Sequence, residues 1–407
     1  MGKGIRTNYQ HTLAASCIGY VTQAVVNNFA PLLFLTFHSA YGILLEKITL
    51  FITLNFLLQL FVDFLSTKVI DKIGYRRAIV SAHLFAGAGL LCLGLLPDCM
   101  ADPYTGILIG VILCAVGGGL DEVLISSIVE GCPTKNKSAT MSFLHSFYSW
   151  GIAFVIVLST AYFLTAGIAH WKWLAVIWAI LPLLNAVYFA LVPIYNTKEE
   201  NERGIGLKKL CSIKIFWVMA LLMMSAGASE TAMSQWASAF AEGALGVSKT
   251  VGDLLGPCLF AVMMGISRTI YARFSNRLNL IVFMTVCGIL CVASYLIVAF
   301  SAAAWLSLTA CGLCGFSVGI MWPGGMSVAI RSVRNGGTAL FAMLALFGDV
   351  GATVGPTFVG LISGAAGDDL RIGISFALVF PVFLVASILI AWRGEKRRLR
   401  FSCMKKR

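Results

Sequence analysis

The sequence predicts an all-α membrane protein with twelve transmembrane helices in two six-helix bundles. Three observations predict this class: the composition, the length of the apolar runs, and the placement of lysine and arginine. Of 407 residues, 59% are hydrophobic and only 12% are charged, whereas about 25% of a soluble domain is charged. A soluble fold of this length would need more polar surface than the chain can supply.

Long apolar runs, several of them free of Asp, Glu, Lys and Arg, predict the individual helices, because about 20 apolar residues cross the hydrocarbon core as an α-helix. The run Leu278–Ile330 is too long for one crossing, so we expect two helices joined near Ser301. In chain order the expected helices are Leu13–Phe37, Ile48–Ile70, Ala78–Leu96, Tyr104–Val129, Ser138–Ala169, Trp173–Pro193, Ile215–Ala241, Gly252–Ile270, Leu278–Phe300, Ala302–Ile330, Gly336–Ala366 and Ile372–Trp392.

The basic residues predict the orientation. With a cytoplasmic N-terminus, 26 of the 30 lysines and arginines fall on the inner side, and the outer side holds only Lys47, Lys172, Lys249 and Arg371. This asymmetry follows the positive-inside rule and predicts a cell-membrane protein with both ends in the cytoplasm. It also accounts for the net charge of +12 without a nucleic-acid partner. The basic tail 393–407 is expected to lie against anionic lipid.

Two similar halves are expected. At a constant offset, Arg77 matches Arg277, Gly119 matches Gly319, and a further set of four residues repeats; that set is Ala139, Leu144, Phe147 and Gly151, matching Ala339, Leu344, Phe347 and Gly351. We therefore expect one bundle over residues 1–194, a cytoplasmic linker over 195–213, a second bundle over 214–392 and a tail over 393–407. Such repeats are typical of transporters with a site between the halves near the midplane.

Acidic residues at membrane depth are the first candidates for function, because an ionised group at the bilayer centre costs at least about 2.5–3.5 kcal/mol. The candidates for carrying a proton are Asp121, Glu122, Glu230 and Asp349. Asp121 and Glu122 are neighbours on one helix and point about 100° apart, so both cannot face one cavity squarely. The alternative to a role as proton carrier is that the acid makes a structural hydrogen bond to a neighbouring helix.

Polar and aromatic residues on four of the expected helices are the candidates for solute binding. They are Gln23, Asn27, Asn28, His145, Tyr148, Gln235, Trp236 and Trp322. Buried amides must satisfy several donors and acceptors, which a hydroxylated solute could do; helix–helix hydrogen bonds are the alternative. Pro323 is expected to kink its helix and to free a backbone carbonyl. Tryptophan rings could stack on a sugar or simply pack in the core.

Nothing in the sequence predicts an enzyme. No nucleophile lies in a pattern with a base, and no metal-ligand spacing occurs. Cys311 and Cys314 form a CxxC on an apolar helix without a histidine or acid beside it, so we expect packing residues. We therefore expect no catalytic residue, no metal and no cofactor, and a chain that works as a monomer with a small solute, protons and membrane lipid as its partners.

Six stretches together resemble the fucose permease group of the major facilitator superfamily, which includes glucose/galactose transporters. They are Asn27-Asn28, Gly119-Leu120-Asp121, the segment Leu144–Gly151, Glu230 with Trp236, Gly319–Pro323, and Gly348–Gly351 with Pro356. The resemblance implies that Asp121 couples protons and binds sugar, and that Asn28 contacts sugar. His145 and Tyr148 stand where the permease has Gln and Asn. Pro31 stands where it has a second coupling Asp.

The loop Asp71-Lys72-Ile-Gly74-Tyr-Arg76-Arg77 also resembles the signature loop of this superfamily, D-R-x-G-x-R-R. The resemblance implies a cytoplasmic gate, to which we assign Asp63, Asp71, Arg76, Arg77 and Arg277. Our working hypothesis is proton-coupled symport of a monosaccharide or a similar small polar solute. The alternatives are a proton-driven exporter of amphipathic compounds and, less favoured, a sensor that does not transport.

Overall fold

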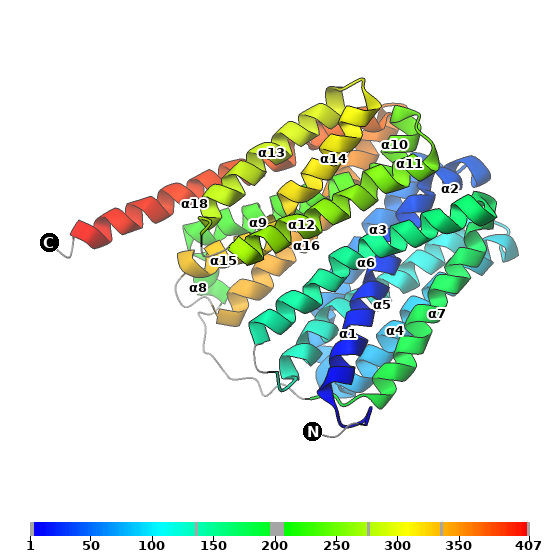
Figure 1. Cartoon of the computed structure of the whole chain (residues 1–407), viewed down its shortest axis with the longest axis horizontal. Coiled ribbons are helices and arrows are strands. Elements are labelled where there is room, and N and C mark those ends of the chain that lie inside the picture. Colours follow the sequence, from blue (N-terminus) through cyan, green and yellow to red (C-terminus); the bar gives the residue numbers. More distant parts are fainter. Residues whose placement is uncertain (1–3, 135–136, 196–206, 275–276, 334–336, 405–407) are drawn as a thin grey trace. The chain divides into compact units, whose positions relative to one another are not determined.

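The computed structural model describes residues 4–134, 137–195, 207–274, 277–333 and 337–404, with no strand in these ranges (Figure 1). Twelve of its helical segments are long and apolar enough to cross a membrane, as the sequence predicts. The chain divides into two compact units. Unit 1 comprises residues 1–199 and 248–261, and unit 2 comprises residues 200–247 and 262–407.

Unit 1 contains the first six spans and the start of the eighth. Its elements are α1 (Tyr9–Asn28), η1 (Ala30–Leu33), α2 (Phe34–Tyr41), α3 (Leu45–Ile73), α4 (Tyr75–Cys99), α5 (Pro103–Gly131), α6 (Lys137–Ala166), η2 (Ile168–His170), α7 (Trp171–Leu191), α11 (Lys249–Asp253) and η3 (Leu254–Cys258). Helix α5 packs against α1, α3 and α4, and α4 also packs against α7. Helix α6 packs against α1 and against η3.

Unit 2 contains the remaining spans. Its elements are α8 (Leu207–Cys211), α9 (Lys214–Ser234), α10 (Ala237–Leu245), most of α12 (Leu259–Phe274), α13 (Leu280–Phe300), α14 (Ala304–Gly319), α15 (Met321–Ser332), α16 (Gly337–Ala365), α17 (Leu370–Ala377) and α18 (Val379–Met404). Helix α9 is its centre, because it packs against α16, α18, α15 and α14.

Proline breaks several spans. The first span changes from α-helix to a 3₁₀ turn at η1, which contains Pro31. The eighth span has a π-helical turn, η3, around Pro257. The tenth span is interrupted at Ile320, three residues before Pro323. Proline lacks the N–H that would bond four residues back, so each break leaves backbone carbonyls that need other donors.

The loop after α3 forms as expected. Gly74 has φ +81°, a left-handed value that only glycine adopts without strain, and it separates α3 from α4. Arg76 then donates from Nη1 to the carbonyls of Phe189 (3.0 Å) and Ala190 (2.7 Å) at the end of α7. A cation at a helix C-terminus satisfies orphan carbonyls and opposes the helix dipole.

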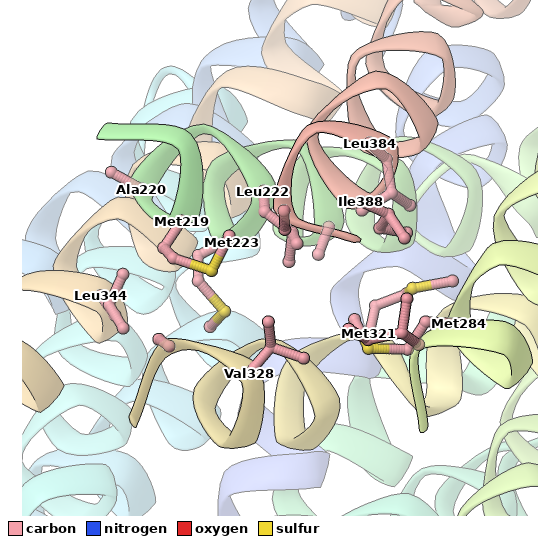
Figure 2. Packing of buried hydrophobic residues seen from close by; sticks show 14 of the residues in the cluster. Met219, Ala220, Leu222, Met223, Met284, Met321, Val328, Leu344, Leu384 and Ile388 are labelled. Atoms are coloured by element: carbon pink, nitrogen blue, oxygen red, sulfur yellow. The ribbon is translucent and has the colours of Figure 1, made fainter. Parts of the chain in front are cut away.

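The core of unit 2 is rich in methionine. Met219 and Met223 of α9 face Val328 of α15, and Met284 and Met321 lie together on the other side of the cluster (Figure 2). Methionine fills irregular gaps well because it is unbranched and flexible. Methionine side chains therefore fill the space between the broken tenth span and its neighbouring helices.

Candidate functional site

One face of α1 carries three polar side chains. Tyr20, Gln23 and Asn27 stand at i, i+3 and i+7, which places them on the same side of a helix. All three are buried. Each meets a polar side chain from another helix of unit 1, so this face organises a polar cluster at membrane depth.

Glu122 of α5 faces Gln23. The amide Nε2 of Gln23 donates to Glu122 Oε2 at 3.0 Å. Glu122 is only half-buried, and within the described ranges it takes part in no ion pair. A carboxylate held by one neutral donor can gain a proton without breaking a salt bridge.

Tyr20 joins two further helices. Its hydroxyl lies 2.8 Å from Ser126 Oγ of α5 and 3.2 Å from His145 Nδ1 of α6. Ser126 is one turn beyond Glu122, so the α5 face that carries both residues lies against the α1 face. His145 is exposed and its ring centroid lies 5.2 Å from that of Tyr20.

Asn27 is held by two amides of α3. Gln59 donates from Nε2 to Asn27 Oδ1 at 2.7 Å and accepts from Asn27 Nδ2 at 3.5 Å. Asn55 Nδ2 also donates to Asn27 Oδ1, at 3.4 Å. The second Asn27 donor bond goes to the hydroxyl of Tyr148 on α6, at 3.5 Å. The α3 amides thus fix the orientation of Asn27, whose amide donates to the hydroxyl of Tyr148.

Asn28 is directed elsewhere. It is buried, and its Nδ2 donates to the carbonyl of Ala24 within α1 at 3.0 Å. This bond satisfies a carbonyl near the break in the first span. A sugar contact by Asn28 stays a prediction.

Asp121 points away from Glu122, as the helix geometry predicts. It is fully buried, and its Oδ1 lies 3.0 Å from His83 Nδ1 of α4. The amide Nδ2 of Asn185 donates to Ala15 O (3.0 Å) and to His83 Nε2 (2.8 Å). His83 Nε2 is therefore an acceptor, and the ring proton sits on Nδ1.

That Nδ1 proton is directed mainly at the carbonyl of Ile79, 3.0 Å away. Among the described residues, neither carboxyl oxygen of Asp121 has a hydrogen bond of normal geometry despite the nearby His83. Asp121 is thus an enclosed acid between α4 and α5, whereas Glu122 stands on the part-exposed polar face.

Three consecutive glycines set the helix spacing around these acids. A Cβ on Gly117 would lie 2.6 Å from the backbone nitrogen of Ala86 in α4. On Gly118 it would lie 3.2 Å from Val26 of α1, and on Gly119 it would lie 3.0 Å from the Cα of Gln59 in α3. Each glycine therefore admits a different neighbour of α5.

Unit 2 holds a second acid beside a cation. Glu230 of α9 is half-buried, and Arg268 of α12 is close enough to act on it electrostatically. Arg268 Nε also donates to the carbonyl of Gly319 at 3.1 Å. Gly319 is the residue four before Pro323, so this is the carbonyl that the proline leaves free, as predicted.

The predicted aromatic and amide contacts of unit 2 lie in packed positions. Trp322 is half-buried and lies over Gly348 of α16, where an added Cβ would fall 2.3 Å from its ring. Trp236 is fully buried and donates from Nε1 to Pro356 O at 2.9 Å. Gln235 is also buried, and Asp349 is half-buried on α16.

The predicted gate is described only in part. The side chains of Asp63 and Asp71 lie outside the described residues. Arg77 and Arg277 are exposed, and Arg76 caps α7 as given above. The gating role of these residues stays a prediction.

Several residues of the polar clusters were not predicted as site residues from the sequence: Tyr20, Asn55, Gln59, His83, Asn185 and Arg268. Asn55 and Gln59 have the same i, i+4 spacing as Gln23 and Asn27, and this amide pair in an apolar helix was a readable signal. His83 and Asn185 are single polar residues in apolar helices, and only the packing of α4 on α7 brings them together.

Comparisons with known proteins agree with this architecture. The family model described as Major Facilitator Superfamily matches residues 12–356. No curated protein matches the sequence. A bacterial homologue of the human lysosomal transporter Spinster, inward-facing and unoccupied, is similar in structure with a TM-score of 0.75 and 14% identity, over 96% of this chain and 98% of that one.

Two other transporters are similar in structure. The fucose:proton symporter FucP of E. coli has a TM-score of 0.63 and 17% identity, over 93% of this chain and 98% of that one. The nucleoside transporter NupG has a TM-score of 0.72 and 11% identity, over 94% of this chain and 99% of that one. At these identities the likeness concerns the fold.

Proposed function

Because the chain belongs to the major facilitator superfamily and is a multi-pass membrane transporter, we propose that it is a proton-coupled symporter of a monosaccharide or a similar small polar solute. The observation that carries the proposal is the bond between Glu122 and Gln23, on a face that also bears the Tyr20 and Asn27 clusters. The proposal places both chain ends in the cytoplasm of a cell whose plasma membrane the chain crosses.

The chemistry of this face suits a neutral, hydroxylated solute. Amides and hydroxyls offer both donors and acceptors, which sugar hydroxyls require. Among the described residues of the Tyr20 and Asn27 clusters, His145 is the one basic side chain. The similarity in structure to FucP, a fucose:proton symporter, supports this solute class, and the similarity to the nucleoside transporter NupG makes nucleosides the first alternative to test.

Glu122 is the proposed proton carrier. When ionised it only accepts hydrogen bonds, and when protonated it can also donate one to a solute hydroxyl. A charge at membrane depth costs about 2.5–3.5 kcal/mol, which is on the order of a 10²-fold difference in population. Protonation would therefore favour reorientation of the loaded carrier, and Glu230 beside Arg268 would offer a second acid whose charge is balanced.

Asp121 has a different proposed role. Enclosed against His83, it would support the packing of α4 on α5, and the proton transfer would fall to Glu122. This assignment departs from the fucose permease pattern, in which the carboxylate at the position of Asp121 couples protons and binds sugar.

Transport by proteoliposomes tests the proposal. Purified protein is reconstituted, and uptake of radiolabelled monosaccharides and nucleosides is measured with and without an imposed pH gradient. Wild type should accumulate one sugar only with the gradient. Glu122→Gln should keep solute exchange and lose accumulation, and the matched variant Asp121→Asn should keep both.

Two outcomes would contradict the proposal. One is gradient-driven accumulation by Glu122→Gln equal to that of wild type, which would remove Glu122 from coupling. The other is a wild type that transports no member of the panel. Outward movement of amphipathic compounds would then favour the exporter.

A further inference from the structure

The eighth span begins with a lysine that lies inside unit 1. Lys249 is the first residue of α11, and residues 248–261 pack with the first repeat although they follow the seventh span in sequence. Elements α11 and η3 contact α6. The rest of α12 continues into unit 2.

The ammonium group of Lys249 joins three elements. Its Nζ donates to the carbonyl of Leu32, which lies within η1. It also pairs with both carboxyl oxygens of Asp253, each at 3.2 Å. Phe163 of α6 presents its ring 5.5 Å from the same nitrogen.

Asp253 balances this charge out of water. Its side chain has no exposed surface, and that of Lys249 is 17% exposed. Thr160 of α6 lies 3.5 Å from Asp253 Oδ2 and can donate to it. A buried acid and base are tolerated when they are paired and hydrogen-bonded, and removing one partner is strongly destabilising because it leaves the other uncompensated.

The carbonyl that Lys249 holds belongs to the break in the first span. Irregular backbone at membrane depth persists only where its polar groups find partners. Element η1 begins two residues after α1 ends, and Asn27 lies in the last turn of α1. An anchor on η1 therefore limits how far the end of α1 can move.

We propose that Lys249 is a positioning residue for transport: neutralised by Asp253, it holds the broken first span through Leu32 and so keeps the Asn27 cluster in place. A displacement of α11 would therefore move η1 through this ammonium group. The inference rests on the proposed function only in that Asn27 contacts the solute.

Hydrogen–deuterium exchange of the purified full-length protein tests the anchor without any solute. Lys249→Met should raise amide exchange in residues 29–37 about tenfold and leave α4 unchanged, because loss of a local anchor opens one segment. Lys249→Arg should restore protection. Lys172→Met is the matched control, since Lys172 pairs with the mostly exposed Asp98 and is expected to leave η1 unchanged.

Asp253 provides a second test. Asp253→Asn should also deprotect residues 29–37, because an unbalanced Lys249 would turn towards water. The double variant Lys249→Met/Asp253→Asn should resemble Lys249→Met alone, since coupled residues are not additive. Unchanged exchange in Lys249→Met, equal deprotection of α4, or additive effects of the two changes would each overturn the proposal.

Sugar uptake separates this inference from the proposed function. For the monosaccharide that wild type accumulates, Lys249→Met should raise KM about tenfold and change kcat less than about twofold, since solute binding is what positioning serves, and Lys249→Arg should restore KM. A fall in kcat at constant KM would contradict a positioning role. If wild type transports no monosaccharide, the proposed function fails, and the exchange experiment still decides whether Lys249 anchors η1.

Discussion

Removing Arg268 should expose the cost of the proline break in the tenth span. Arg268 Nε donates to Gly319 O, the carbonyl that Pro323 cannot reach with an N–H. Arg268→Met removes this donor, and it also removes the cation beside Glu230. Pro323→Ala restores a backbone N–H four residues after Gly319, and because residue 323 is exposed it should create no cavity.

The magnitude follows from the type of bond. A hydrogen bond to a charged group contributes about 1.5–3 kcal/mol in soluble proteins, and interhelical bonds in a membrane protein average about 0.6 with a maximum near 1.7 kcal/mol. This bond is charge-assisted and its acceptor residue, Gly319, is buried. We therefore expect Arg268→Met to cost about 1–1.5 kcal/mol less in the Pro323→Ala background than in wild type.

Unfolding in SDS, followed by circular dichroism, measures the four corners of this double-mutant cycle. Arg273→Met serves as control because Arg273 is exposed on the same helix, α12; we expect it to change stability by less than about 0.5 kcal/mol. An Arg268→Met cost that is equal in both backgrounds would refute the reasoning, since the bond to Gly319 would then contribute nothing.

Three further predictions concern packing, hydrogen bonding and pH. Gly351→Ala should destabilise the protein by about 1–3 kcal/mol in the same assay, because its Cβ would lie 1.9 Å from a backbone carbonyl oxygen of α9. Gly288→Ala is the control and should cost less, because the atom nearest to its Cβ would be a side-chain methyl at 3.0 Å. Tyr20→Phe should cost about 1–2 kcal/mol, since it removes a buried hydroxyl with two partners; an unchanged unfolding midpoint would contradict the Tyr20 cluster. Asp102 is the N-cap of α5, and a hydrogen bond from the hydroxyl of Thr105 is the main cause that lowers its pKa. The contribution of the ionised Asp102 to stability is therefore fully present above the unfolded pKa of 3.8, and it is lost as the pH falls through the lowered pKa of the folded state. The protection of the amides at the start of α5, taken relative to their intrinsic exchange rate at each pH, should fall at low pH in wild type. Asp102→Asn, which caps without a charge, should abolish this loss of protection.

The spans could be predicted from the sequence because each depends on one local property, a long apolar run. The breaks were harder. Pro323 predicts its own break, since proline removes a specific hydrogen bond. The seventh span divides at Gln235 without a proline, next to a bond from Trp236 to Pro356 on a helix more than a hundred residues away. Local propensity holds no signal for such a contact.

For the polar site, the sequence predicts the directions of the side chains on each helix, and it does not predict their partners. The directions of Asp121 and Glu122 follow from about 100° per residue on a helix, and the structure agrees. The partners do not follow, because they depend on which helices pack together. His83 meets Asp121 since α4 lies on α5, and Gln59 meets Asn27 since Gly119 lets the backbone of α3 approach α5.

The glycine triplet of α5 restricts how unit 1 can move. A different neighbouring helix lies against each of Gly117, Gly118 and Gly119. A rotation of α5 about its own axis would replace a glycine by a larger side chain, which would clash with at least one of these neighbouring helices. Sliding along the axis meets the same obstacle. Helix α5 can therefore neither rotate about its axis nor slide along it relative to α1, α3 and α4. Glu122 lies three residues after the last of these glycines, so it moves only together with these helices.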